Sequence, residues 1–278
     1  MRTRLQTAIF RQPVILACVI FIAGLTLLAI LAPLLPLNDP TSQSVVARLQ
    51  PPSAQYPMGT DRLGRDVLSR LIWGTQVSLI VGVGVVVVCA VVGSLAGVWT
   101  GYFRNWSSEL IMRLTDVMLA FPPLVLAMVM VALLGNHIYT VILAISVAVI
   151  PRFTRIARAS VLTVRHQGYV EAAHGLGSNT PSILWRHLLL NAVDPLIVIC
   201  TFLIPTAILT EATLSFIGLG VVEPTPTWGN MINDGQLVLR EAPWLVGFPS
   251  MAVLLTVLAF NLLGDAVRDA LDPNVPGL

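Results

Sequence analysis

Lysine is absent from this chain of 278 residues, and all 16 basic side chains are arginine. A P-loop needs a lysine to contact nucleotide phosphates, and Schiff-base catalysis needs a lysine amine, so this chain has neither chemistry. Charge of either sign is scarce, at 11% of residues, against roughly 25% in soluble domains. The chain is therefore not a soluble globular protein, and any work driven by ATP needs another subunit.

Cysteine and histidine are also too few and too scattered to suggest a metal site. The three cysteines lie far apart inside apolar runs, where we expect small core residues: Cys18, Cys89 and Cys200. The four histidines fall in predicted loops at unrelated spacings: His137, His166, His174 and His187. We expect no metal and no cofactor in this chain. A net charge of +2 gives no indication of nucleic acid as a partner.

Long uncharged runs predict an all-α membrane protein with six transmembrane helices. At about 1.5 Å per residue, the run Val117–Pro151 exceeds one bilayer crossing, so we divide it into two antiparallel spans with a hairpin at Gly135. The other predicted spans are Val14–Leu35, Val77–Tyr102, Asn191–Leu219 and Ala242–Gly264. With the N-terminus inside, eleven of the 16 arginines, including Arg2, Arg4 and Arg11, fall on the cytoplasmic side. Both termini are then cytoplasmic.

The segment between the first two spans predicts a helix on the membrane surface. Thr60 and Asp61 offer an N-cap, and the stretch Leu63–Ile72 places its apolar residues on one face. We therefore divide the chain into residues 1–76, with the tail, first span, extracytoplasmic segment and surface helix, and a core of residues 77–278.

Glycine recurs at every fourth position in the second span. Gly93, Gly97 and Gly101 form a strip along which another helix can approach closely. The same spacing also arises by chance in glycine-rich spans, so the strip is either a packing interface or a coincidence.

The cytoplasmic segment 152–190 carries more structure than a connector needs. Gly177 is a helix stop, and Thr180 with Pro181 predicts the start of a second short helix. Ala172 and Ala173 leave room for another surface, to which Glu171 and His174 offer polar contacts. The alternative is an amphipathic connector resting on lipid headgroups.

Three carboxylates near or within the spans are candidates for lining a polar pathway through the membrane or its gate, because a buried charge in a membrane is costly unless it is paired or wet. Glu211 lies deepest, and either faces the pathway or is a hydrogen-bonded packing residue. Asp116 either pairs with Arg113 one turn away or contacts substrate. Asp194, followed by Pro195, is more typical of a span boundary.

Several motifs together resemble a known family. The pattern Glu171-Ala-Ala, Gly177 and His187 resembles the EAA loop of bacterial ABC importer permeases. More narrowly, four further motifs, in order, are similar to the dipeptide, oligopeptide and nickel permease group, in particular its second, C-type subunit: Met58–Arg70, Ser215–Gly220, Pro226–Met231 and Ala259–Pro273. Leu190 stands where that family commonly has proline, so we expect the fifth span to begin as an unbroken helix.

The resemblance implies a type I importer permease in the bacterial cytoplasmic (inner) membrane. Such a subunit pairs with a homologous permease, receives cargo from an extracytoplasmic solute-binding protein, and couples through its EAA helix to one or two cytoplasmic ATPases that bind ATP and Mg. We expect no enzyme activity in this chain. Short peptides are the favoured cargo, and nickel chelates, glutathione or haem-like molecules are alternatives.

Two other classes of function fit the sequence less well. A proton-coupled secondary carrier would use Asp116 or Glu211 as its proton site. It would leave the segment 152–190 without a task, and the chain has no convincing internal repeat. A membrane enzyme would need a GxSxG, HExxH or paired carboxylate motif, and none is found.

Overall fold

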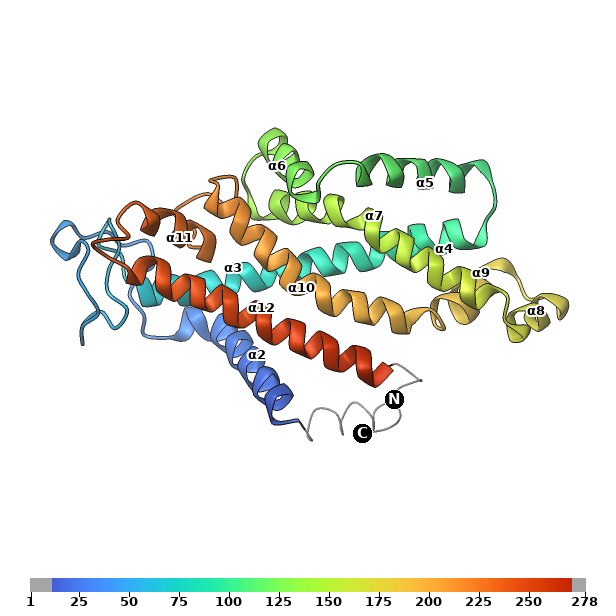
Figure 1. The fold of residues 1–278 in the computed structure, drawn as a ribbon, viewed down its shortest axis with the longest axis horizontal. Coiled ribbons are helices and arrows are strands. Elements are labelled where there is room, and N and C mark those ends of the chain that lie inside the picture. The colour runs from blue at the N-terminus through green and yellow to red at the C-terminus, as the bar shows by residue number, and fades with distance from the viewer. Residues whose placement is uncertain (1–11, 272–278) are drawn as a thin grey trace.

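The computed structural model describes residues 12–271, and these residues form a helical bundle that contains no β-strand. Long helical rods run side by side along the molecule's long axis (Figure 1). The helices, in chain order, are α2 (Pro13–Leu31), η1 (Ala32–Leu34), η2 (Val45–Ala47), α3 (Val67–Val88), η3 (Cys89–Gly93), α4 (Ser94–Tyr102), α5 (Trp106–Leu119), α6 (Pro123–Leu134), α7 (Ile138–Arg165), α8 (Gly168–Gly175), α9 (Thr180–Ser182), η4 (Ile183–Leu189), α10 (Val193–Phe216), α11 (Trp228–Gln236) and α12 (Trp244–Leu271).

The predicted all-α architecture is confirmed. Five helical stretches are long and apolar enough to cross a membrane: Pro13–Leu34, Val67–Tyr102, Ile138–Arg165, Val193–Phe216 and Trp244–Leu271. Helices α5 and α6 make a sixth crossing if they count as one span, although they are bent by 95°. The predicted arginines Arg2, Arg4 and Arg11 lie outside the described residues, so the orientation of the termini stays a prediction.

The third span differs from the single helix that we predicted. Helix α5 ends at Leu119 and α6 begins at Pro123. Pro122 and Pro123 explain the break, because proline has no N–H to donate and disfavours a helical residue before it. The hairpin at Gly135 is confirmed, since α6 ends at Leu134 and Gly135 adopts a φ of 93°.

The predicted surface helix is wrong. Helix α3 begins at Val67, with the Asp66 side chain accepting a hydrogen bond from the Leu68 N–H, and it continues through α4 as one long span. Its apolar face is covered by protein, because Val67 packs with Met231 and Leu245 from α11 and α12. The second span therefore begins ten residues before the predicted Val77, and α3 runs through the proposed division at residue 76.

The glycine strip lies against α7, where backbones come close. A Cβ atom on Gly97 would lie 2.3 Å from the Cβ of Ala157, and one on Gly101 would lie 2.8 Å from Val161. A Cβ on Gly93 would meet Phe153 at 2.7 Å. Any larger side chain on this strip would therefore separate α4 from α7.

The boundaries of the predicted segment 152–190 also change. Helix α7 extends to Arg165, so the arginines from Arg152 onward continue the fourth span before the chain turns into α8. Asn179 caps α9 by accepting a hydrogen bond from the Ser182 N–H, one residue before the predicted cap Thr180. Leu190 does not give an unbroken fifth span, because a turn at residues 190–192 separates η4 from α10.

Candidate functional site

One end of the bundle holds a network of charged side chains around Arg65. The network builds on a tight loop, in which the Asp61 Oδ1 atom accepts hydrogen bonds from the backbone N–H groups of Leu63 and Arg65 at 2.8 and 2.9 Å. Gly64 makes this loop possible, with a φ of 75° and no space for a Cβ atom beside Ser44. The loop therefore aims the Arg65 guanidinium inward, and it does so before α3 begins.

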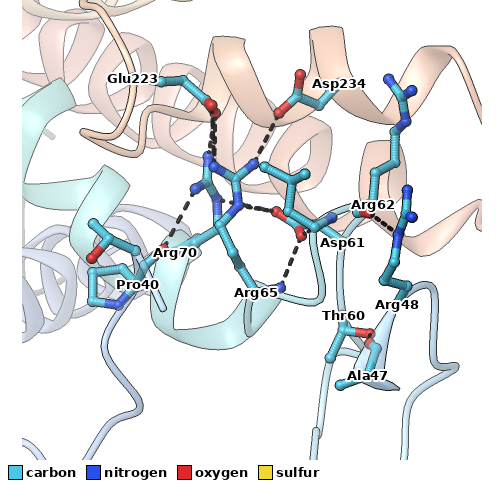
Figure 2. Close-up of polar contacts among 12 residues, drawn as sticks. Pro40, Ala47, Arg48, Thr60, Asp61, Arg62, Arg65, Arg70, Glu223 and Asp234 are labelled. Carbon is cyan, nitrogen blue, oxygen red and sulfur yellow. Dashed lines mark hydrogen bonds and ion pairs between the residues drawn. The ribbon is translucent and has the colours of Figure 1, made fainter. Parts of the chain in front are cut away.

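Arg65 joins this loop to α11 and to the segment before it (Figure 2). Its Nη1 atom donates to both Glu223 carboxylate oxygens at 3.1 Å, its Nη2 atom to Asp234 at 3.2 Å, and its Nε atom to Asp61. Arg70, from the first turn of α3, also donates to Glu223 at 3.0 Å. The two arginines are only 3% and 1% exposed. Two buried cations thus hold three carboxylates from distant parts of the chain.

These contacts shift the pKa values of the loop and α11 groups. Burial raises the pKa of the Glu223 carboxyl, but the hydrogen bonds and charge of Arg65, with Arg70, outweigh it, so the pKa lies below its usual value. Burial and the neighbouring Glu223 charge raise the pKa of Asp234. Burial lowers the pKa of Arg65, but its bonds to Glu223 and Asp61 raise it by more. Arg65 therefore stays charged.

Our sequence reasoning missed this network. It placed Asp61 on a surface helix and gave Glu223 and Asp234 no role. The available signal was the cluster of charges of both signs from Asp61 to Arg70, which two acidic residues beyond the fifth span can complete. Only the fold shows that these segments meet.

Glu211 lies beneath this network, fully buried among α3, α10 and α11. Its Oε1 atom accepts a hydrogen bond from Ser215 at 2.7 Å. The hydroxyls of Ser78 and Thr227 lie next to the carboxyl without completing a hydrogen bond to Oε2. Glu211 is 0% exposed and lines neither of the two large cavities described below. In this conformation its surroundings are those of a packing residue.

The other end of the bundle carries α8, α9 and η4, which protrude beyond the rods (Figure 1). Glu171 and Ala172 are exposed on α8, whereas Ala173 is buried at 8% exposure and faces the chain itself. The side chain of His174 lies outside the described residues. Gly177 has a φ of 78° with no atom within 4 Å of its Cβ position, so it ends α8 in open space. Of the residues predicted to contact another protein on α8, Glu171 and Ala172 are therefore exposed and Ala173 is not.

An exposed apolar tip on this end was also missed from the sequence. Leu176, between α8 and Gly177, is 88% exposed, and Trp185 on η4 is 55% exposed. Both exposed apolar side chains belong to the α8 end.

Two of the predicted pathway residues do not pair with each other. Asp116 on α5 forms its ion pair with Arg155 on α7, and Arg113 pairs with Glu109. The predicted Arg113–Asp116 pair is therefore wrong. Arg113 and Asp116 are one helical turn apart, which would allow an ion pair, but α7 lies alongside α5 and Asp116 pairs with Arg155 on α7 instead. All four side chains are more than half exposed.

Two large cavities of different character lie along the rods. One, of about 740 Å³, lies between α3–α4, η4 and α10, and apolar side chains such as Val91, Leu95 and Ile197 form nearly all of its lining. The other, of about 720 Å³, lies between α6, α7, α10 and α12, and it mixes apolar and polar side chains. We call the second cavity the mixed groove. Its polar residues are Arg152, Asp194, Thr206, Thr210 and Arg268.

Among residues 12–271, no group of three or more histidine, cysteine and acidic side chains lies close enough to hold a metal ion.

Comparisons with known proteins agree with one another. Residues 93–276 match the family described as the binding-protein-dependent transport system inner membrane component. The chain is 40% identical over 256 residues to the dipeptide transport system permease protein DppC of Alkalihalophilus pseudofirmus, covering 92% of this chain and 84% of that one. It is 44% identical over 226 residues to the glutathione transport system permease protein GsiD of Escherichia coli, covering 81% and 75%.

A solved structure has the same fold. The inward-facing MetNI methionine ABC transporter contains a chain that superposes with a TM-score of 0.61 at 16% identity, covering 73% of this chain and 96% of that one. The common fold thus extends over most of the bundle.

Proposed function

Because this chain belongs to the family of binding-protein-dependent transport system inner membrane components, we propose that it is the permease subunit of an ATP-driven importer of short peptides. It forms half of the translocation pathway together with a homologous permease. The single observation that carries this proposal is the mixed groove, which places charged and hydroxyl side chains along helices long enough to span a membrane. A polar groove on such helices needs water or cargo, because lipid cannot satisfy it.

The α8 end couples the permease to its motor. Since the chain has no lysine and therefore no P-loop, ATP and Mg bind to separate cytoplasmic ATPase subunits. Leu176 and the exposed face of α8, with Glu171 and Ala172, contact these subunits. This end is cytoplasmic, as are both termini.

The α11 end faces the solute-binding protein. The ion pairs of Arg65 join α11 to the loop that precedes α3, so the two segments move as one body when a binding protein docks on them. ATP binding closes the ATPase pair and moves α8, and the long helices tilt to open the groove outward. Nucleotide can shift this equilibrium only by binding one conformation more tightly than the other.

Peptides are the cargo that the relatives favour. Those described above are named for dipeptide and glutathione transport, and glutathione is itself a modified tripeptide. Nickel chelates and haem-like cargo receive no support from these names. The importer resides in the bacterial inner membrane.

The test is ATP-dependent uptake by the purified complex. The tagged chain is extracted in mild detergent with its co-purifying subunits, reconstituted with the binding protein, and supplied with radiolabelled tripeptide. We expect uptake with ATP and Mg and none with a non-hydrolysable analogue. Uptake that survives ATP removal and follows a proton gradient would contradict the proposal and favour a secondary carrier.

A further inference from the structure

The mixed groove contains three charged side chains that come from three different helices. Arg152 is on α7, Asp194 begins α10 and Arg268 is near the end of α12, and all three are exposed. None of them forms an ion pair within residues 12–271. What distinguishes these three charges is that they line one cavity together, whereas the ion pairs of α5 and of the network around Arg65 lie outside it.

Two cations and one anion in a shared cavity match the two ends of a peptide. A free peptide has a carboxylate at one end and an ammonium group at the other. A guanidinium binds a carboxylate through paired hydrogen bonds, and a carboxylate binds an ammonium group. The cavity of about 720 Å³ lies within the range of roughly 300–1,000 Å³ that is usual for small-ligand sites.

The walls of the groove suit a peptide of any sequence. Thr206 and Thr210 donate their hydroxyl hydrogens to the carbonyls of Phe202 and Thr206 at 2.7 Å, so their oxygen lone pairs are free to accept from a peptide N–H. The rest of the lining is apolar, including Ile145, Val149 and Leu203. Nothing in it recognises a particular side chain.

We propose that Arg152 and Arg268 bind the C-terminal carboxylate of a short peptide in the mixed groove, and that Asp194 binds its free N-terminus. The inference rests on the proposed function and deepens it, since the permease then recognises the cargo a second time, after the binding protein has selected it. The groove recognises the ends of the peptide and tolerates its side chains.

The experiment uses the reconstituted complex and two radiolabelled tripeptides that differ only at the C-terminus, one free and one amidated. Uptake of each is measured for the wild type, Arg152→Gln and Arg268→Gln, and the free-to-amidated ratio is compared between complexes. Because all complexes use the same binding protein, its own preference for free or amidated peptide cancels when the ratios are compared. We expect each variant to lower this ratio by about tenfold, the effect of losing one charge-assisted hydrogen bond. Asp194→Asn, tested with an N-acetylated tripeptide, should reduce the preference for a free N-terminus in the same way.

The matched control is Arg104→Gln, an exposed arginine between α4 and α5 that does not line the groove. It should leave the ratio unchanged. If Arg152→Gln and Arg268→Gln slow both peptides by the same factor, the arginines serve the lipid headgroups or the fold, and the inference is overturned. If the wild-type complex takes up no peptide with ATP, the proposed function fails, and this inference fails with it.

Discussion

At the α11 end, two arginines that are at most 3% exposed hold three carboxylates inside the chain, whereas at the α8 end Glu171 is exposed and Leu176 is 88% exposed. The first end pairs its buried arginines with carboxylates and buries Trp228 at 0% exposure, although Val46 and Leu237 there are 91% and 68% exposed. The second leaves apolar and charged groups in water. Both ends expose apolar side chains, so the difference between them is the buried ion-pair network, which holds the α11 end together and has no counterpart among the described residues of the α8 end.

The largest expected effect is a break in the α11 end. Arg65→Met leaves Asp61, Glu223 and Asp234 without their common partner, and removing one member of a buried ion pair costs about 3–5 kcal/mol. We expect the thermal unfolding midpoint of the purified chain in detergent to fall sharply. Arg62→Met is the control, because its side chain contributes none of the ion pairs of the network (Figure 2). Equal midpoints for the two variants would mean that the network does not hold this end together.

The next effect tests the α8 end. Leu176→Arg changes a side chain that touches little of its own chain, so the unfolding midpoint should stay within the error of the wild type. Uptake driven by ATP should nevertheless fall by about tenfold or more, since a buried contact with an ATPase subunit is worth at least 1.4 kcal/mol. A pull-down of the ATPase subunits measures the same loss directly.

Ala173→Arg, on α8 and three residues before Leu176, sharpens this comparison. Ala173 is 8% exposed and faces the chain, so the substitution should lower both the unfolding midpoint and uptake. A mutant at position 176 that behaves like the one at position 173 would show that the exposed tip has no separate role in coupling.

Sequence and structure agree best where one physical signal dominates. Long uncharged runs and the Gly135 hairpin follow from hydropathy and glycine geometry. The first and fifth spans were predicted closely, whereas the second begins at Val67 and not Val77, and the fourth and sixth continue to Arg165 and Leu271, past the predicted Pro151 and Gly264. The surface helix failed because its apolar face, including Val67, is covered by α11 and α12 and not by lipid. Periodicity shows that a face is apolar, but it does not show what covers it.

The candidate site was harder to predict, for a related reason. Asp116 pairs with Arg155, which is 39 residues away, although Arg113 is closer along the chain. Arg65 meets Glu223 across 158 residues. Such pairings depend on how the helices are placed side by side, which no local pattern contains. The sequence motifs therefore indicate which segments matter, but the ion pairs that these segments form can be known only from the fold.

A smaller effect concerns the polar centre beneath the α11 end. Glu211→Gln keeps an oxygen that can accept from Ser215 and adds an N–H that can donate to Ser78, so stability should change by less than about 1 kcal/mol. Uptake should remain close to that of the wild type, because Glu211 lines neither cavity. A strong loss of uptake in a normally assembled complex would place Glu211 in the pathway or gate.

The smallest effect is the response of the α11 end to acid, where Glu223 and Asp234 act in opposite directions. The pKa of Glu223 is lower in the folded chain than its ordinary 4.5, so its contribution to stability is present above pH 4.5 and is lost as the pH falls through the folded value. The pKa of Asp234 is raised above 3.8, so the folded chain binds that proton more tightly and its protonation favours folding.

Glu223→Gln should therefore flatten the loss of stability below pH 5, and Asp234→Asn should steepen it. Each change should stay below about 1 kcal/mol, because both side chains are more than a third exposed and water screens them. Unfolding midpoints measured from pH 7 to pH 3 distinguish the two signs, and identical slopes in both variants would mean that Arg65 does not hold the two carboxylates differently.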